Sequence, residues 1–188
     1  MSLLHSGFAD PVRDSQAVFR AVLDAMARPG HVHAVAAPAE PPPPLDRATA
    51  AVLLTLIDAE TPLWMDGRAD AAREWTAFHC GATPAEPGHA SFAVALQMPL
   101  LSTLSPGSDE EPESSATLIL QVQAIGEGTT LTLSGPGLAT PGTLAVRGLP
   151  DDFIGQWEAN RRKFPRGVDL ILCAGDRLAA LPRTIEVT

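Results

Sequence analysis

The stretch FPRGVDLILC, Phe164–Cys173, contains the segment that decides the fold. Its second half, VDLILC, is apolar at every position except Asp169, and a nearly continuous apolar run is typical of a strand that is covered on both faces. The turn Ala174–Asp176 and a second apolar run, Leu178–Leu181, come next. We expect a neighbouring strand that ends at Pro182, because proline has no N–H group to donate to a ladder.

Helical and strand patterns alternate along the rest of the chain. A helix is predicted to begin with Asp14 as its N-cap and to end at Arg28–Gly30, and another to open at Pro150–Asp151 and close at Phe164–Pro165. Two more helices are predicted over Asp46–Ile57 and Ala69–Cys80, and strands over His31–Ala36, Leu63–Met65 and Ser91–Ala95.

Two further strands, Thr117–Ile125 and Thr130–Ser134, are separated by Gly126–Gly128. Glycine between two apolar runs is typical of a hairpin, so we expect these strands to pair antiparallel. Helices between strands, a hairpin and one doubly buried strand predict an α/β fold, a mixed β-sheet flanked by helices. With 188 residues, the chain is expected to form a single domain over 1–188.

Two segments are expected to be loops. Pro38–Pro44 is rich in proline and predicts a stiff, extended surface connection. Ser105–Ser115 combines proline, glycine, serine and four acidic residues without apolar periodicity, which predicts an acidic, mobile loop. Its acidic cluster has two interpretations, a solvated loop or a docking surface for a partner.

Composition excludes several classes of protein. A formal net charge of −9 without a basic stripe argues against a nucleic-acid partner. The most apolar run, Ala50–Ile57, is much shorter than the roughly 20 residues that span a bilayer, so no membrane attachment is expected. Cys80 and Cys173 form no spaced cluster, so neither a disulfide framework nor a zinc site is predicted, and a reducing cytoplasm fits.

Three short motifs suggest chemistry but have structural interpretations too. Ser134–Gly137 (SGPG) resembles a phosphate cradle, yet it lacks the lysine and the helix of a P-loop, so a plain turn is favoured. His31 and His33 have metal-ligand spacing without an evident third ligand. Cys80 follows a histidine, but helix neighbours point about 100° apart. Burial is the preferred interpretation for Cys80 and also for Cys173, which lies inside an apolar strand.

Arginine supplies nearly all of the positive charge, and Lys163 is the only lysine. Guanidinium groups bind carboxylates and phosphates in a fork, so the arginines around the closing strands are candidates for binding a ligand or a partner. The alternative is that they are solvated or paired with acids. The candidate residues are Arg161, Arg166, Arg177, Arg183 and Thr184, of which Arg183 and Thr184 are expected at an exposed edge of the sheet.

Six segments together resemble the PhnH family, subunits of the bacterial carbon–phosphorus lyase system. The resemblance extends over essentially the whole chain, and its closing block, FPRGVDLILCAGDRLAALPRT, is the most specific part. The other segments are FRAVLDAMARPG (19–30), DAETPLWM (58–65), ATLILQV (116–122), LSGPGL (133–138) and GLPDDF (148–153).

The resemblance implies organophosphonate breakdown in the cytoplasm. PhnH acts with PhnG, PhnI and PhnL when a phosphonate displaces adenine from ATP to give a ribose 1-phosphonate 5-triphosphate, and PhnJ cleaves the carbon–phosphorus bond. The family implies a homodimer that joins PhnG-, PhnI- and PhnJ-type subunits, and a fold like the large domain of PLP-dependent transferases. It transfers no catalytic residue, so we expect a scaffold or accessory subunit that is not catalytic alone.

Two other functions remain open at this point. A free-standing pyridoxal-phosphate (PLP) transferase would need a Schiff-base lysine, and only Lys163 exists, near a predicted helix end, so no PLP and no metal are expected. The other alternative is a small anionic-ligand-binding protein, or a subunit whose arginines bind an anion directly.

Overall fold

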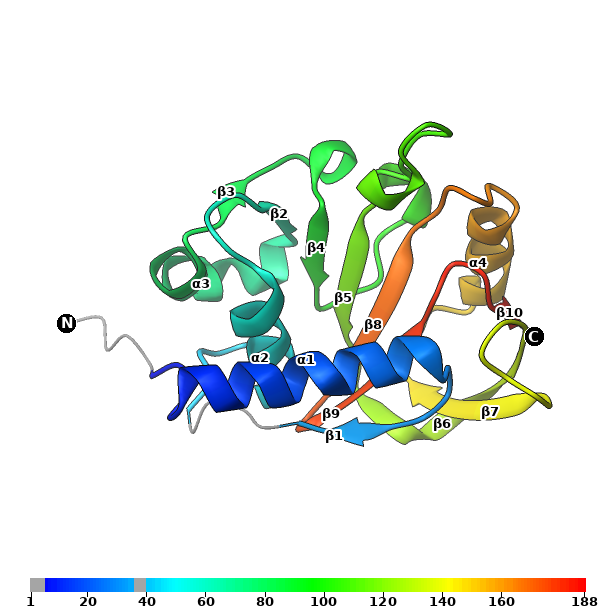
Figure 1. The fold of residues 1–188 in the computed structure, drawn as a ribbon, viewed down its shortest axis with the longest axis horizontal. Helices are drawn as coiled ribbons and strands as arrows, with labels where there is room; N and C mark the ends of the chain where they lie inside the picture. The colour runs from blue at the N-terminus through cyan, green and yellow to red at the C-terminus, as the bar shows by residue number, and fades with distance from the viewer. Residues whose placement is uncertain (1–5, 36–39) are drawn as a thin grey trace.

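A seven-stranded mixed sheet forms the centre of the computed structural model, which describes residues 6–35 and 40–188 (Figure 1). Strands β8, β5, β4, β2 and β3 run parallel, whereas β9 is antiparallel to β8 and β1 is antiparallel to β9. The predicted α/β class and mixed sheet are therefore confirmed. In order across the sheet the strands are β1 (His33–Ala34), β9 (Arg177–Leu181), β8 (Asp169–Ala174), β5 (Thr117–Gln121), β4 (Phe92–Ala95), β2 (Pro62–Met65) and β3 (Thr83–Pro84).

A second, smaller sheet of three antiparallel strands packs beside the large one. Its order is β10 (Glu186–Val187), β6 (Ala124–Ser134) and β7 (Gly142–Arg147). The chain therefore passes from the large sheet to the small one between β9 and β10. This passage places the C-terminal segment in contact with both sheets.

The predicted hairpin between Thr117–Ile125 and Thr130–Ser134 is wrong. β5 pairs in parallel with β4 and β8, and the residues after it belong to β6, which continues through Gly126–Gly128 instead of turning back. The pairing register of β6 with β7 shifts between Ile125 and Thr129, which both lie opposite Val146, so the glycines lie in an irregular part of the ladder. The antiparallel partners of β6 are β7 and β10, two strands that the sequence patterns did not identify.

Helices cover both faces of the large sheet. α1 (Pro11–Ala27), α2 (Arg47–Leu56) and α3 (Arg73–Cys80) contribute to the core on one face, whereas α4 (Phe153–Arg161) and the small sheet contribute to the core on the other face. Four short 3₁₀ helices lie in the described connections: η1 (Gly67–Ala72), η2 (Pro87–His89), η3 (Leu101–Thr103) and η4 (Pro112–Ser114).

The central strands divide their side chains between these two cores. In β8, Leu170 and Leu172 face α4 and the small sheet, while Ile171 and Cys173 face the helices α1–α3. All four are at most 1% exposed. The prediction that VDLILC is a strand covered on both faces is confirmed, and its burial explains why the sequence is apolar without alternation.

Some predicted boundaries need correction. The N-cap of α1 is Asp10, four residues before the predicted Asp14: the Asp10 carboxylate accepts a hydrogen bond from the Arg13 N–H, and Pro11 is the first helical residue. Of the predicted strand His31–Ala36, only His33–Ala34 forms β1 among the described residues, and Ala36 lies outside them. The first part of Ala69–Cys80 is the end of η1 rather than α-helix.

The two predicted loops contain no strand or α-helix in the described residues. Of the proline-rich loop 38–44, residues 38 and 39 lie outside the described part. The acidic loop Ser105–Ser115 contacts the closing segment, because Gly167 N–H donates to Pro106 O over 2.8 Å. Its mobility stays a prediction. No helix in the described ranges is long and apolar enough to cross a bilayer.

Candidate functional site

The closing segment of the chain builds a polar network around Arg183. Its guanidinium forms an ion pair with Asp169 on β8: Nε lies 3.2 Å from both carboxylate oxygens, and Nη2 lies 2.5 Å from Oδ2. The Arg183 main-chain N–H also donates to Asp169 Oδ1 over 2.7 Å. Arg183 Nη1 donates to Pro112 O in the acidic loop over 2.7 Å. One side chain thus joins β8, the segment after β9 and the acidic loop.

The expectation of an exposed Arg183 at the edge of the sheet is therefore wrong. The side chains of Arg183 and Asp169 are only 15% and 20% exposed. The chain does not stop at an edge after Pro182 but turns through Arg183 and the half-buried Thr184 to enter β10. Asp169, the only polar residue within VDLILC, is the ion-pair partner that keeps the arginine inward.

The other predicted arginines divide into two groups. Arg166 Nε lies 3.0 Å from Asp109 Oδ1 of the acidic loop, and Arg161 Nη2 lies 3.8 Å from Glu186 Oε1 in β10. Together with Arg183 and Thr184 they belong to the region around the closing segment. Arg177 lies at the opposite end of β9, where it pairs with β1. Acids face three of the four clustered candidates, so this cluster is mainly cross-linked within the chain, and its role in binding stays a prediction.

Asn160 and Trp157 on α4 fix this region and were missed as polar anchors. Asn160 Nδ2 donates to Val168 O over 2.9 Å, and Val168 N–H donates to Asn160 Oδ1 over 2.8 Å. Trp157 Nε1 donates to Ile185 O over 2.8 Å. Both side chains are buried. The signal for Asn160 was its spacing: it follows Phe153 by seven residues and Trp157 by three, which places it on the buried face of α4, where an amide needs backbone partners.

Both cysteine thiols are buried, as predicted. Burial raises the pKa of Cys80 to about 11 and the pKa of Cys173 to about 12. A thiol is nucleophilic as the thiolate, so both are protonated and unreactive near neutral pH. Cys80 Sγ lies 3.7 Å from Leu53 O, and neither thiol is placed for nucleophilic chemistry.

The histidine pair does not form a metal centre in the described structure. His33 Nε2 lies 3.0 Å from Asp24 Oδ2, whereas His31 is exposed in the turn after α1. Across residues 6–35 and 40–188, no group of three or more His, Cys, Asp and Glu side chains is arranged to hold a metal ion.

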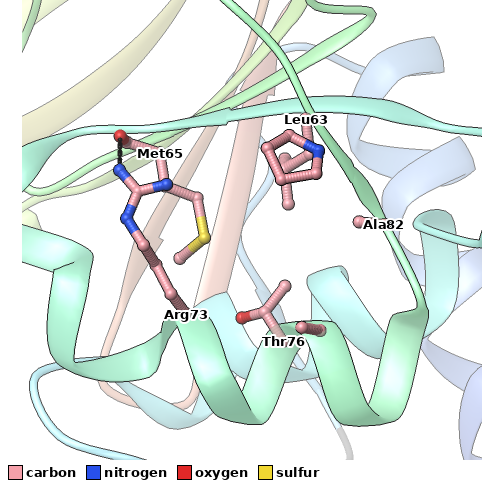
Figure 2. Close-up of a pocket in the computed structure, with 7 residues that line it drawn as sticks. Leu63, Met65, Arg73, Thr76 and Ala82 are labelled. Carbon is pink, nitrogen blue, oxygen red and sulfur yellow. Dashed lines mark hydrogen bonds between the residues drawn. The ribbon is translucent and has the colours of Figure 1, made fainter.

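A small pocket of about 120 Å³ lies between α3 and the strands β2 and β3 (Figure 2). Leu63, Met65 and Ala82 give it a mainly apolar lining, and Arg73 borders it. Arg73 Nη2 donates to Met65 O over 2.6 Å, and its Nε donates to Asp70 Oδ1 over 2.6 Å. Because the guanidinium is engaged, the pocket suits an apolar group better than an anion. Sequence reasoning missed it, since Arg73 appeared only as a helix residue.

An exposed apolar stripe runs along the outer face of α1. Val12, Phe19 and Leu23 are 78%, 46% and 52% exposed, and their spacing of seven and four residues places them on one side of the helix. The buried face of α1 is formed by other residues, Val18, Val22 and Ala25. Large apolar side chains aligned on an exposed helix are typical of a contact surface.

Comparison with known proteins identifies the family. The sequence profile described as "Bacterial phosphonate metabolism protein (PhnH)" matches residues 6–188. The chain is 42% identical, over 99% of its length and 96% of the relative's, to "Alpha-D-ribose 1-methylphosphonate 5-triphosphate synthase subunit PhnH" of Rhizobium meliloti (strain 1021). It is 35% identical, over 92% of its length and 85% of the relative's, to "Putative C-P lyase subunit protein HtxG" of Stutzerimonas stutzeri. The chain therefore belongs to the PhnH family of bacterial phosphonate metabolism proteins.

Proposed function

We propose that this protein is a subunit of the carbon–phosphorus lyase system and serves the synthase that forms a ribose 1-phosphonate 5-triphosphate from ATP and a phosphonate. The observation that carries the proposal is the 42% identity to the Rhizobium meliloti synthase subunit over nearly the full length of both chains. The second relative is also named as a putative C-P lyase subunit. Two relatives aligned over most of the chain support a shared role rather than a shared fold alone.

The role that fits the side chains is that of a scaffold or accessory subunit. The side chains best suited to catalysis or anion binding already have structural roles. The two thiols are buried, and Arg183 is bonded to Asp169 and to Pro112 O. Catalysis by the subunit alone would need such groups to be free. We therefore place the chemistry on the assembled synthase and not on this chain alone.

The α1 stripe is the surface that we propose for self-association or for contact with PhnG-, PhnI- and PhnJ-type subunits. Val12, Phe19 and Leu23 extend over eleven residues, about 16 Å along a helix axis. A twofold axis beside α1 would pair the stripe with itself and remove these side chains from water. We expect the isolated protein to be a homodimer of this kind, located in the cytoplasm.

A PLP-dependent activity does not fit the residues present. Lys163 borders a pocket of about 160 Å³ between η3 and α4 whose other described lining residues include Leu100, Leu101 and Gln156 and no aspartate or arginine. A PLP site needs an acidic or basic partner for the pyridine nitrogen besides the lysine. Any likeness to the large domain of PLP-dependent transferases would thus be one of architecture, and we propose that no PLP is bound. A yellow protein bleached by borohydride would contradict this.

Growth on a phosphonate tests the proposed function. The gene is deleted in the bacterium that encodes it, and the strain is supplied with phosphate or with methylphosphonate as the sole source of phosphorus. We expect normal growth on phosphate and none on methylphosphonate, with growth restored by the intact gene. Normal growth of the deletion strain on methylphosphonate would refute the proposed function.

Co-purification tests the proposed surface. The double variant Phe19→Asp/Leu23→Asp is compared with Ala17→Asp, which adds a carboxylate to an exposed position of α1 outside the stripe. We expect the stripe variant to lose the dimer in sedimentation or the other synthase subunits in a pulldown, while Ala17→Asp keeps both. Equal behaviour of the two variants would show that the stripe is not a contact surface.

A further inference from the structure

A polar cavity of about 390 Å³ lies where the C-terminal end of α1 meets the loop between β6 and β7. These segments are far apart in the sequence but lie side by side in the fold (Figure 1). The eleven lining residues come from two short runs, Arg28–His31 and Gly137–Thr143. Neither the predicted arginine cluster nor the pocket beside α3 contributes to it.

Glycine allows the two runs to approach each other. Gly137 has φ of +87°, and a Cβ atom there would lie 2.4 Å from Ala27 O, too close for any other residue without movement of the backbone. Gly30 has φ of +90°, and its Cβ would lie 3.1 Å from Leu133 Cδ1. The main chain of the β6–β7 loop thus packs directly against the main chain at the end of α1.

The cavity lining contains an arginine and no acidic residue, although the protein as a whole is acidic. The eleven lining residues include Arg28 and His31 and no aspartate or glutamate, whereas the whole chain has 22 acidic residues against 13 lysines and arginines. Thr140 and Thr143 add hydroxyl groups to the lining. Guanidinium, hydroxyl and peptide N–H groups are the donors that oxyanions require.

Two features beside the cavity carry negative charge and therefore disfavour the binding of an anion. Asp24 accepts a hydrogen bond from Arg28 Nη2, and α1 ends at the cavity, where helix carbonyl groups carry partial negative charge. The Arg28 side chain is nevertheless 58% exposed, and guanidinium has five N–H donors, of which Asp24 uses only part. A ligand must therefore be strongly charged and accept several hydrogen bonds to compete.

We propose that this cavity binds a phosphate-class oxyanion: inorganic phosphate, a phosphonate, or the phosphate chain of a nucleotide. Arg28 supplies the charge, and the hydroxyl groups of Thr140 and Thr143 supply further donors. The site goes beyond the proposed subunit role and does not rest on it. The SGPG motif, which the sequence patterns favoured as a plain turn, provides with Gly137 the close approach that forms the cavity.

NMR titration of the isolated ¹⁵N-labelled protein with inorganic phosphate, methylphosphonate or ATP tests the proposal. We expect saturable shifts of the Gly30, Gly137 and Gly142 amides. Arg28→Ala should weaken binding about tenfold or more, as loss of a charge-assisted hydrogen bond does. Arg20→Ala is the matched control, because it removes an exposed arginine from the same helix outside the cavity.

A second pair of variants changes the cavity without touching the arginine. Ala139 is an exposed lining residue, so Ala139→Asp adds a repelling charge and should abolish binding, whereas its neutral isostere Ala139→Asn should not. Thermal unfolding of each variant checks that it is folded.

Two outcomes would overturn the proposal. One is the absence of shifts with all three ligands at roughly 10 mM, where a site with a millimolar Kd would be about 90% occupied. The other is binding that Arg28→Ala and Ala139→Asp leave unchanged. Binding of ATP that adenosine displaces but phosphate does not would place recognition on the base and would also overturn it. None of these outcomes affects the growth test of the proposed subunit role.

Discussion

Arg183→Ala should destabilise the protein substantially, because the arginine is part of a largely buried network. Removing one partner of a buried ion pair costs about 3–5 kcal/mol, and an exposed pair contributes about 0–1 kcal/mol. The Arg183 and Asp169 side chains are 15% and 20% exposed, close to the buried case. In the alanine variant the main-chain N–H of residue 183 can still donate to Asp169, so we expect a loss of about 2–3 kcal/mol.

The free energy of unfolding can be measured by urea denaturation followed by tryptophan fluorescence. For a chain of this size about 1 kcal/mol corresponds to 2–4 °C, so the Tm should fall by about 4–12 °C. Arg177→Ala is the matched control: it removes an exposed arginine from the other end of β9 and should change stability by less than about 0.5 kcal/mol. A double-mutant cycle with Asp169→Asn would isolate the coupling between the two side chains.

The reasoning is refuted if Arg183→Ala and Arg177→Ala unfold with the same free energy. Equal stability would mean that the ion pair and the bond to Pro112 O contribute nothing net. The stability of Arg183→Ala also decides whether this variant can be used in binding experiments. A variant that loses partner subunits because it is partly unfolded would say nothing about a binding role for Arg183, so co-purification should be measured only on variants shown to be folded.

Three further predictions concern the core, the thiols and the close approach of two loops. Leu172→Ala should cost about 2–5 kcal/mol in urea denaturation, since the side chain is fully buried, and a loss below about 1 kcal/mol would contradict the assigned core. Burial raises the Cys173 pKa from 9.0 to about 12; the unfolded chain therefore loses this proton first, and stability should fall as the pH rises from 9 towards 12, less steeply in Cys173→Ala. Gly137→Ala should lower the Tm because of its positive φ and the 2.4 Å approach to Ala27 O, whereas Gly142→Ala, with its nearest neighbour at 3.7 Å, should have little effect; equal Tm values for the two variants would contradict the close approach.

Much of the large sheet could be predicted from the sequence because its strands are buried on both faces. VDLILC, SFAVA and LWM are apolar runs without alternation, and each forms a strand of the large sheet close to the predicted bounds. The helices could be placed by their apolar periodicity. Their exact starts could not, because Asp10 and Asp14 are both acceptable N-caps and only the fold selects Asp10.

The small sheet and the polar contacts could not be predicted in the same way. Gly126 and Gly128 predict a turn, but glycine is equally suited to an irregular part of a continuous strand, and only the pairing with β7 distinguishes the two. The pairing of Asp169 with Arg183 joins residues 14 positions apart, and the approach of Gly137 to Ala27 joins two distant segments. Neither contact leaves a local signal, so the candidate arginines could be named but their partners could not.

The position of β8 between β5 and β9 has a consequence for how the protein folds during synthesis. β5 lacks one neighbour until β8 is made, and β1, near the N-terminus, pairs only with β9 among the described strands. Residues 186–187 then complete the edge of the small sheet. A nascent chain that has not yet reached these strands exposes an unpaired edge and apolar side chains such as Leu118 and Leu120. Folding of the two sheets therefore waits until β8, β9 and β10 have been synthesised, and slow synthesis of these strands would prolong the time during which the chain is open to aggregation or to chaperones.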